Sequence, residues 1–525
     1  MTSQVFFKKL NQVNPSYKPE RWVFIPYDQL NEKIGPLHEF RDASPGIILI
    51  ETSWKPKRRR YHKQKLAHLL SNQRHFALEQ AARGIRVEYI IGRDSYSTLL
   101  KQFIGTHGLV HMAEAAEREL RNDLAVLEAQ ELIMVHPHTG WLTTPKEFQK
   151  AADKNGKWRM DKFYRLVRKR TGILMDDDGK PIGGQYSFDD QNRKPWRDEH
   201  TVPNVPSFKP TDITLEVCQL VETHFAEHPG RIQPERIAAT KTQAEKVWKH
   251  AKNECMKLFG DFEDAMTTKH RRLFHTGLSE LLNLHRLLPG DIVKDALNLD
   301  IPLNSKEGFI RQIIGWREFV YHVHRATDGF RLSGLGKRIE YPRGQFLPAR
   351  YALPPVFWGT ESGLKCLDQA VQEVMEDGYT HHINRLMILS NWATLLGINP
   401  LEVSEWFWSC FTDAYEWVVE PNVLGMGTFG AGDLMTTKPY VSGSGYVSKM
   451  SDYCKSCHFN PKKDCPMTPL YWSFLHRNKE KLSTNPRLKL VMASENKRSD
   501  EKKSEDLKTF RHVTEILQRG DRVAP

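Results

Sequence analysis

The sequence of 525 residues has no apolar run that could cross a membrane. A membrane-spanning helix needs about 20 consecutive apolar residues, whereas the longest apolar runs, such as Gly46 to Ile50, have only the length of a β-strand. The residues from Met1 to Pro19 are largely polar and do not form the apolar core of a signal peptide. We therefore expect no membrane partner. We also expect a cytoplasmic monomer.

Cysteine is scarce as well. The chain has seven cysteines, and so sparse and odd a set in a long chain excludes a secreted scaffold held by disulfides and favours a reducing compartment. The glycine-rich phosphate loop that follows the first strand of dinucleotide-binding folds is also missing, so a dinucleotide site is not expected there.

Basic residues, in contrast, are in excess. The chain has 76 Lys and Arg against 64 Asp and Glu, which is a formal net charge of +12. A basic surface attracts phosphates and releases counterions when it binds them. The charge therefore favours a polyanionic partner such as a nucleic acid, and the alternative is a generic basic surface.

The first part of the chain alternates short apolar runs with helical patterns. We predict strands near residues 22–26, 46–50, 85–91, 109–112 and 132–135, and helices at 61–83 and 113–130. This alternation predicts a Rossmann-like α/β domain with a parallel sheet. Ligands of such sheets bind at the carboxyl ends of the strands, and this edge carries Asp28, Gln29, Leu30 and Glu51.

The remainder of the chain predicts a second, all-α domain. Helical periodicity continues from about residue 211, interrupted by Gly and Pro stops, and a proline-rich connector precedes it. We predict five regions: a frayed polar leader (1–20), the α/β domain (21–138), an interdomain linker (139–210), the all-α domain (211–480) and a charged C-terminal tail (481–525).

One stretch of the all-α domain carries three cysteines at a metal-binding spacing. Cys454 and Cys457 form a Cys-x-x-Cys pair, and Cys465 follows just before a proline. Zinc sites and iron–sulfur clusters usually take four ligands, so one ligand is missing, and the spacing does not separate the two kinds of centre. The candidates for the fourth ligand are Cys366, Cys410, Cys255, Cys218 and His458.

Two segments of the all-α domain offer groups for phosphate. Thr276 and Ser279 stand at a predicted entry from a loop into a helix, where free backbone N–H groups suit phosphate, although such residues are often ordinary helix caps. Arg317 can serve a phosphate or stack on a base, and the plainer interpretation is a buried pair with Glu318.

A third segment begins with the adjacent histidines His381 and His382 and continues to Arg385 and Asn391. Neighbouring side chains point about 100° apart on a helix, so one histidine can face a cavity while the other packs. Histidine is the natural acid or base near neutral pH. The segment is therefore a candidate active site, although single histidines are more often structural.

The fourth segment runs from Trp406 to Trp417 and includes Asp413 and Tyr415. Its side chains can line a planar cofactor or form an aromatic core helix. The chain has 13 tryptophans, and seven of them lie from Trp316 onward, in the same half as the cysteine stretch. This density makes electron transfer between aromatic rings a further hypothesis.

These four segments, in this order, resemble the cryptochrome/photolyase superfamily, and within it the bacterial iron–sulfur branch that includes the prokaryotic (6-4) photolyases. The opening strand with its Asp28-Gln-Leu turn, the linker motif Asn192-Arg-Lys-Pro195, the segment Ile314-Gly-Trp-Arg-Glu-Phe319 and the cysteine stretch carry the likeness as well. The resemblance covers roughly residues 20 to 480.

The resemblance implies three cofactors. A bent FAD would lie in the all-α domain, and the residues that the resemblance assigns to it are Thr276, Leu278, Ser279, Arg385, Asn391, Asp413 and Tyr415. A 4Fe–4S cluster would take Cys366 as its fourth ligand, beside Cys454, Cys457 and Cys465. An antenna, 6,7-dimethyl-8-ribityllumazine, would lie in the α/β domain near Asp28, Gln29, Leu30 and Glu51.

The implied activity is light-driven repair of pyrimidine(6-4)pyrimidone photoproducts in UV-damaged DNA, by electron transfer from photoexcited reduced FAD, with Mg²⁺ as a further cofactor to test. His382, beside His381, would transfer a proton to the lesion, and Trp406 and Trp358 would relay electrons. The residues that the resemblance places near the DNA or the lesion are Arg317, Tyr440 and Tyr446.

The sequence departs from this branch at several positions. The loop between Cys457 and Cys465 has seven residues, fewer than expected, and Gly277 and Glu280 replace an apolar residue and a proline. The acid expected near the flavin stands one position late, at Glu420. The alternatives are a blue-light-sensing cryptochrome, a cyclobutane-dimer photolyase, and a DNA-binding protein with a plain iron–sulfur or zinc site.

Overall fold

Five strands form one parallel sheet in the order β3-β2-β1-β4-β5. They are β1 (Trp22–Phe24), β2 (Gly46–Thr52), β3 (Arg86–Gly92), β4 (Val110–Ala113) and β5 (Ile133–His136). The computed structural model, which describes residues 4–525, thus confirms the predicted parallel α/β sheet. Ile47, Ile48 and Leu49 of β2 are completely buried, because helices cover both faces of such a sheet.

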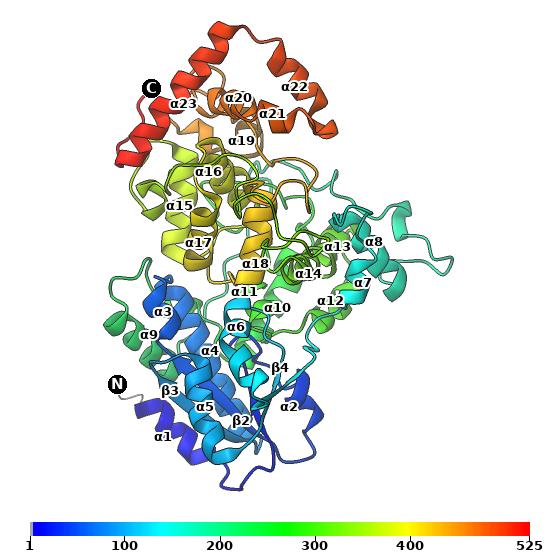
Figure 1. The fold of residues 1–525 in the computed structure, drawn as a ribbon, viewed down its shortest axis with the longest axis vertical. Coiled ribbons are helices and arrows are strands. Elements are labelled where there is room, and N and C mark those ends of the chain that lie inside the picture. Colours follow the sequence, from blue (N-terminus) through cyan, green and yellow to red (C-terminus); the bar gives the residue numbers. More distant parts are fainter. Residues whose placement is uncertain (1–3) are drawn as a thin grey trace.

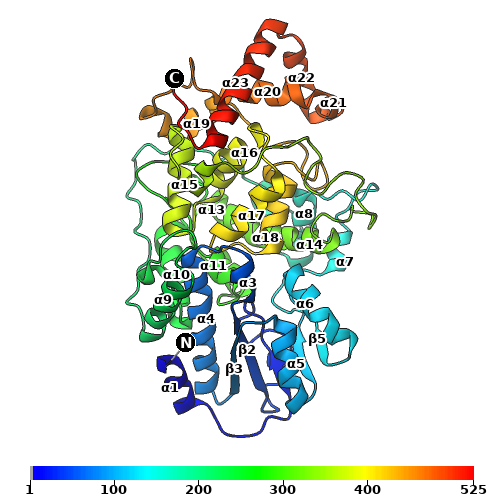
Figure 2. The ribbon, with the colours of Figure 1, turned by 60° about the vertical axis from the view of Figure 1, so that its left-hand side comes forward.

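Helices alternate with these strands and lie on both sides of the sheet (Figure 2). They are α2 (Gly35–Glu39), α3 (Trp54–Arg58), α4 (Lys63–Ala82), α5 (Tyr96–His107) and α6 (Arg118–Ala129). The long helix α4 packs against β2 and β3, while α5 packs against β2 and α6. This arrangement leaves the carboxyl ends of the strands directed toward the rest of the molecule (Figure 1).

The leader differs from the frayed segment that its polar composition predicted. Residues Gln4–Val13 form a helix, α1, which packs against α4. Phe6 and Leu10 are buried, because they stand four residues apart on one face of the helix and meet apolar partners there. Beyond the helix, the Asn14 side chain exchanges two hydrogen bonds of 2.8 and 2.9 Å with the backbone of Val87.

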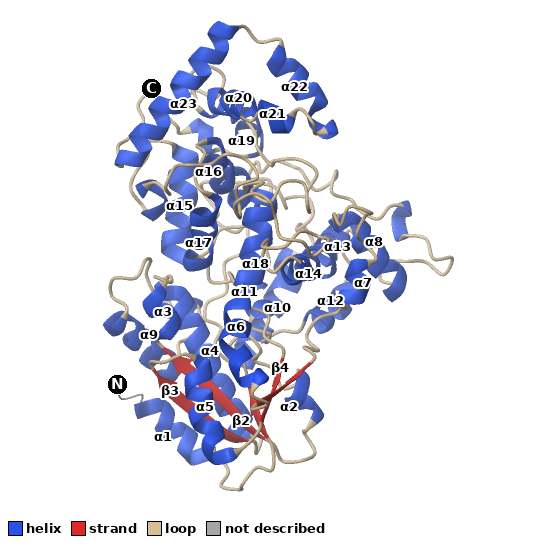
Figure 3. Ribbon diagram, viewed as in Figure 1, coloured by secondary structure: helices blue, strands red, loops and turns tan. Residues whose placement is uncertain are grey.

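The regular elements from residue 139 onward are helices, and long irregular loops join them (Figure 3). The helices of its first half are α7 (Pro145–Gln149), α8 (Met160–Thr171), α9 (Asp212–His224), α10 (Lys241–His250), α11 (Ser279–Asn283), α12 (Pro289–Leu297), α13 (Leu303–Ile310) and α14 (Glu318–Ala326). Those that follow are α15 (Lys365–Asp377), α16 (Asn391–Leu395), α17 (Pro400–Cys410), α18 (Glu416–Glu420) and α19 (Ser444–Met450). No helix among the described residues has the length and apolar character of a bilayer span.

The last helices form the end of the molecule opposite the sheet (Figure 1). They are α20 (Met467–Arg477), α21 (Lys479–Leu482), α22 (Lys489–Asn496) and α23 (Asp500–Arg519). The charged tail contains α23, which agrees with the short surface helix that the sequence indicates near Asp506 to Arg519 and extends it to Asp500. Phe510, Val513 and Leu517 are buried on α23, which packs against α20, so the polar residues of the tail are one face of an amphipathic helix.

Candidate functional site

Four cysteine thiols meet between α15 and the stretch after α19. Burial raises the pKa of the Cys366 thiol, and the nearby thiols of Cys465, Cys454 and Cys457 raise it further. All four are free cysteines. The fold therefore brings the three-cysteine motif to Cys366, a residue of another helix nearly ninety positions earlier in the sequence.

The spacing of these sulfurs bears on the kind of metal centre. Four thiolates bound to one zinc ion at about 2.3 Å lie about 3.8 Å apart. Among the described residues, no three of the cysteine sulfurs lie within 4.8 Å of one another, so the thiols are not gathered at the spacing of a bound zinc ion. The indole N–H of the buried Trp392 points at Cys366 Sγ over 3.4 Å, and hydrogen bonds to sulfur are usual around iron–sulfur clusters.

Asp413 is the centre of a second polar group. Its carboxylate accepts two hydrogen bonds of 3.0 Å from the fork of Arg385 and one of 2.7 Å from Ser279. The Asn283 side chain holds the Asp413 backbone carbonyl at 2.8 Å. Burial alone would raise the pKa of Asp413, but Arg385 and Ser279 lower it. The site therefore holds an ionised carboxylate and its guanidinium partner inside the helical part.

The structure brings some of the residues predicted for FAD together and separates others. Ser279 begins α11 beside the Arg385–Asp413 pair, and the preceding Leu278 is buried, with Thr276 in the adjoining loop. Asn391 instead exchanges hydrogen bonds of 3.1 Å with the backbone of Ser442. Tyr415 lies at the junction with the sheet, where its ring stacks on that of Tyr27 at 6.5 Å.

The histidine pair lies next to Arg385. His381 is buried and stacks on His275, with ring centroids 4.7 Å apart. Two ring nitrogens, His381 Nδ1 and His275 Nε2, are buried without a hydrogen-bond partner among the described residues. Buried polar atoms are nearly always paired in native structures, so these atoms fit a polar cofactor beside Arg385 and Asp413. The residues present are thus compatible with FAD.

His382 occupies the outer position of the pair. Its side chain is 47% exposed, and its Nε2 atom lies 3.5 Å from the carboxylate of Asp264. Partial burial lowers the pKa of His382, but the hydrogen bond with Asp264 and the charge of Glu263 outweigh this effect and raise the pKa. Sequence reasoning missed Asp264, because its only signal is this contact across the fold.

The two tyrosines predicted for the lesion lie near Arg193, and one of them also lies near Asp264, the partner of His382. Burial raises the pKa of Tyr446, and the charge of Asp264 raises it further, so this ring stands beside the partner of His382. Tyr440 lies near Asp189 and Arg193, and Arg193 is also 3.8 Å from Asp264. Arg193 belongs to the linker motif Asn192-Arg-Lys-Pro195, one of the segments that carry the family resemblance. This motif is the only feature of the sequence that could have indicated Arg193.

Trp406 and Trp358 lie on a route from the interior to the surface. Trp406 is buried, donates its indole N–H to the Phe357 carbonyl at 2.8 Å and packs edge-on against Phe411 at 5.7 Å. Phe411 in turn lies 4.4 Å beneath the guanidinium of Arg385. Trp358 follows Phe357 in the chain and is 47% exposed. Aromatic residues thus connect the exposed Trp358 with the Arg385–Asp413 pair.

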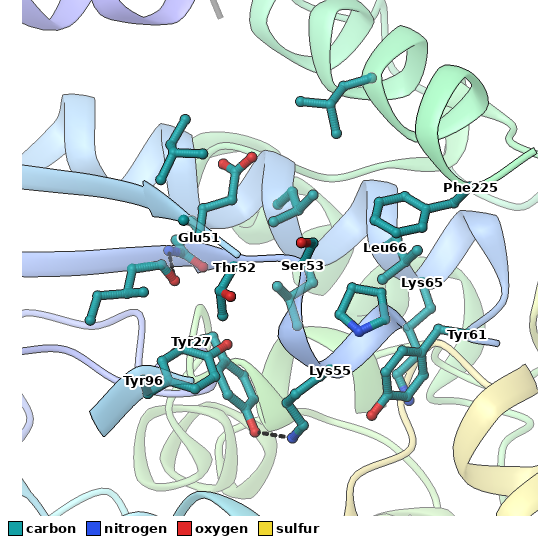
Figure 4. Close-up of a pocket in the computed structure, with 18 of the residues that line it drawn as sticks. Tyr27, Glu51, Thr52, Ser53, Lys55, Tyr61, Lys65, Leu66, Tyr96 and Phe225 are labelled. Carbon is teal, nitrogen blue, oxygen red and sulfur yellow. Dashed lines mark hydrogen bonds between the residues drawn. The ribbon is translucent and has the colours of Figure 1, made fainter. Parts of the chain in front are cut away.

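A cavity of about 240 Å³ opens at the carboxyl ends of β2 and β3 (Figure 4). Glu51 lines it together with Lys55, Glu117, Tyr27 and Tyr96. The ammonium group of Lys55 lies 2.6 Å from the Glu117 carboxylate and 2.7 Å from the Tyr27 hydroxyl. Burial alone would raise the pKa of Glu117, but Lys55 lowers it to about 2. The cavity is smaller than the roughly 300 Å³ of most ligand sites and suits a compact ring system.

The other residues predicted for the antenna do not line this cavity. Asp28 is buried, and its carbonyl lies 2.6 Å from His285 Nδ1. Gln29 donates to the Glu114 carbonyl at 2.9 Å, and the Leu30 backbone donates to the Leu284 carbonyl at the same distance. These residues hold the loop after β1 to its neighbours.

Arg317 is buried near His285, where the helical part meets the loop after β1. Its guanidinium stacks over the rings of Trp141 at 4.2 Å and Trp417 at 5.3 Å. It is also 3.7 Å from Glu318. The structure therefore does not bring Arg317 to the surface with the tyrosines, and its surroundings match the buried pair that was the plainer interpretation of this motif.

Glu420 lies apart from the Arg385–Asp413 pair. Its carboxylate pairs with Arg343 and stands 3.3 Å from His324. His324, Glu416 and Glu420 offer three buried ligand atoms within 4.8 Å of one another. Several arginines already surround this group, and after burial they are the main reason why the pKa of His324 is lowered. Arg343 thus already supplies a positive partner for the Glu420 carboxylate.

A five-stranded parallel sheet joined to a helical part, which holds a largely buried Arg–Asp pair and a histidine pair, is the arrangement of a photolyase-type protein. Residues 23–237 match the family model of deoxyribodipyrimidine photo-lyase-related proteins. A (6-4) photolyase of Agrobacterium fabrum is 35% identical over 484 residues, which cover 89% of this chain and 93% of the relative.

Solved structures agree with this fold. A bacterial class III photolyase from Agrobacterium tumefaciens superposes with a TM-score of 0.54 at 14% identity, over 95% of this chain and 99% of that one. A Synechocystis cryptochrome gives a TM-score of 0.52 at 14% identity, over 97% of this chain and all of that one. The chain belongs to the cryptochrome/photolyase superfamily, in its bacterial branch.

Proposed function

We propose that this protein uses light to repair pyrimidine(6-4)pyrimidone photoproducts in UV-damaged DNA. The observation that carries the proposal is the placement of the half-exposed His382, held by Asp264, beside the buried Arg385–Asp413 pair. The 35% identity to a protein named (6-4) photolyase supports the choice of lesion. FAD, when bound, would supply the light-driven electron that starts repair.

The surface around His382 suits a lesion turned out of the helix. Enzymes that act on a base must flip it out of the stack, because the target atoms are not accessible inside a duplex. Tyr446 lies near Asp264, the partner of His382, and Tyr440 lies near Arg193, so both rings could stack on an extruded base. His382 would hold a proton and give it to the lesion, and Asp264 would keep the imidazole oriented and protonated. The net charge of +12 supports contacts with the DNA backbone.

We propose the remaining cofactors on narrower grounds. The convergence of Cys366 with Cys454, Cys457 and Cys465 supports a 4Fe–4S cluster with a structural role, because it fastens the C-terminal end to α15. The cavity beside Glu51 supports a lumazine antenna. Mg²⁺ is proposed only as an addition to the repair assay. We also propose that the protein is a cytoplasmic monomer. It would associate with the nucleoid when it binds DNA.

Repair of defined lesions tests the proposed function. Reduced protein under blue light should restore the bases of a (6-4) photoproduct, with or without added Mg²⁺. A protein that shows flavin absorption but restores no lesion would be a light sensor of the cryptochrome type, and a protein without flavin absorption would refute both photochemical functions.

Retention of FAD should depend on Asp413. In Asp413→Asn the fork of Arg385 loses its carboxylate, and breaking a largely buried pair costs about 3 to 5 kcal/mol because one charge is left unpaired. We expect the ratio of flavin to protein in the purified variant to fall at least tenfold. Asp433→Asn is the matched control, because Asp433 is 44% exposed and pairs with Lys157 away from this site. Equal flavin content in both variants would contradict the placement of FAD.

Photoreduction should depend on Trp406. Phenylalanine at this position keeps an aromatic ring but is much harder to oxidise, so Trp406→Phe should slow the light-driven reduction of bound flavin by about tenfold or more. Trp472→Phe is the control, because Trp472 lies on α20 and packs against Arg498. Rates are compared under steady illumination with an external reductant. An unchanged rate in Trp406→Phe would show that electrons take another route.

A further inference from the structure

The helix that precedes the sheet has no role in the functions proposed above, yet its contacts lead to the cavity. The first turn of α1 donates two backbone hydrogen bonds to the Glu216 carboxylate, from Val5 at 2.8 Å and from Phe6 at 3.2 Å. Glu216 belongs to α9, which packs against α1 and α4. The leader is therefore joined to the rest of the protein through a carboxylate.

The Glu216 carboxylate also contacts a residue in the interior, Arg74. Glu216 accepts a hydrogen bond of 3.1 Å from Arg74, whose side chain is completely buried. Arg74 also donates two bonds of 2.9 and 2.8 Å to the two oxygens of Glu51. Glu51 stands near the end of β2 and lines the cavity (Figure 4). Charge-assisted hydrogen bonds of this kind are the stronger and more directional ones in proteins.

The leader also covers this ion pair from water. Phe6 is completely buried, its ring lies 5.3 Å from the guanidinium of Arg74, and it packs edge-on against Tyr89 at 4.6 Å. Tyr89 donates its hydroxyl to Glu51 at 2.9 Å. Removal of α1 would let water reach the two carboxylates, and hydration weakens such bonds because they then compete with solvent.

We infer that α1 is a positioning element of the antenna cavity, which acts through Glu216 and Arg74 to fix the carboxylate of Glu51 at the cavity wall. The inference rests on the proposed antenna role of the cavity. Among the described residues, the hydrogen bonds of this network lead to Glu51 and Tyr89 and to none of the residues proposed for FAD. Disturbing it should therefore weaken binding of the antenna and leave FAD in place.

The test uses the full chain loaded with FAD and a titration with 6,7-dimethyl-8-ribityllumazine. Glu216→Gln keeps the shape of the side chain but loses the charge that holds Arg74, and we expect the Kd for the lumazine to rise about tenfold, the usual effect of one lost bond to a charged group. Phe6→Ala should also raise the Kd for the lumazine. Flavin content, and repair under light that flavin absorbs directly, should stay unchanged.

Lys9→Ala is the matched control, because Lys9 lies on the same helix and makes an exposed ion pair with Asp212 at 3.2 Å. If Glu216→Gln bound the lumazine with the same Kd as Lys9→Ala, the inference would be overturned. A loss of FAD in parallel with the lumazine would overturn it too, because it would show a general loss of structure. A wild-type protein that binds no lumazine would refute the antenna proposal itself, and the two failures are thus distinguishable.

Discussion

Cys366→Ala should abolish the metal centre, with iron falling from about four atoms per chain to nearly none. A 4Fe–4S cluster takes four protein thiolates, and the structure supplies Cys366 from α15 and the other three from the stretch between α19 and α20. The loss would also release this stretch from α15. We therefore expect lower soluble yield and a lower melting temperature, because binding of a metal centre contributes directly to folding.

Cys218→Ala is the control for this variant. Cys218 is a buried free cysteine on α9, away from the four thiols. Iron and acid-labile sulfide are measured in both variants after purification without oxygen. Full iron in Cys366→Ala would show that the fourth ligand lies elsewhere, and stoichiometric zinc in the wild type would replace the cluster with a mononuclear site.

His382→Ala should lower the rate of light-driven repair by at least a hundredfold while lesion binding changes little. Proton transfer by a positioned side chain usually contributes 10²- to 10⁴-fold to a rate, and alanine leaves neither a proton donor nor a bulky obstruction. Repair is measured as restored bases per unit of absorbed light, and binding by a shift assay on the same DNA. His476→Ala, which alters a histidine with 36% exposure on α20, is the control.

The pH dependence of repair tests the role of Asp264 separately. Because the pKa of His382 is raised in the folded protein, the imidazole stays charged to higher pH than in a free peptide. Activity that needs the charged form is present below this folded pKa and is lost as the pH rises through it. Asp264→Asn removes the acid that raises the pKa, so the loss should begin at lower pH. A pH profile identical to that of the wild type would exclude this pairing.

The parallel sheet was predictable because buried strands and amphipathic helices leave different periods in the sequence. The ordered leader was not, because burial of Phe6 depends on contacts with Arg74 and Tyr89, which are distant in sequence. The tail helix was partly predictable from its pattern, but the burial of its apolar face against α20 was not, because that face is hidden among many charges.

The candidate site was predictable only where a local motif marks it. The cysteine stretch and the histidine pair stand out by spacing, whereas Cys366 came from the family resemblance and Asp264 from the fold alone. The antenna residues illustrate the opposite case. Asp28 follows β1 and Glu51 lies near the end of β2, but only Glu51 lines the cavity, while the Asp28 backbone carbonyl meets His285. Strand position therefore did not determine which side chain faces the cavity.

The most direct test is repair of two DNA strands that differ only in their lesion. One carries a single (6-4) photoproduct and the other a cyclobutane dimer, and each is incubated with reduced, flavin-loaded protein in blue light or in darkness. We predict restored bases only for the (6-4) photoproduct and only in light, with the activity missing in His382→Ala. Restoration of the cyclobutane dimer alone, or of neither lesion by a protein that retains its flavin, would contradict the proposed function.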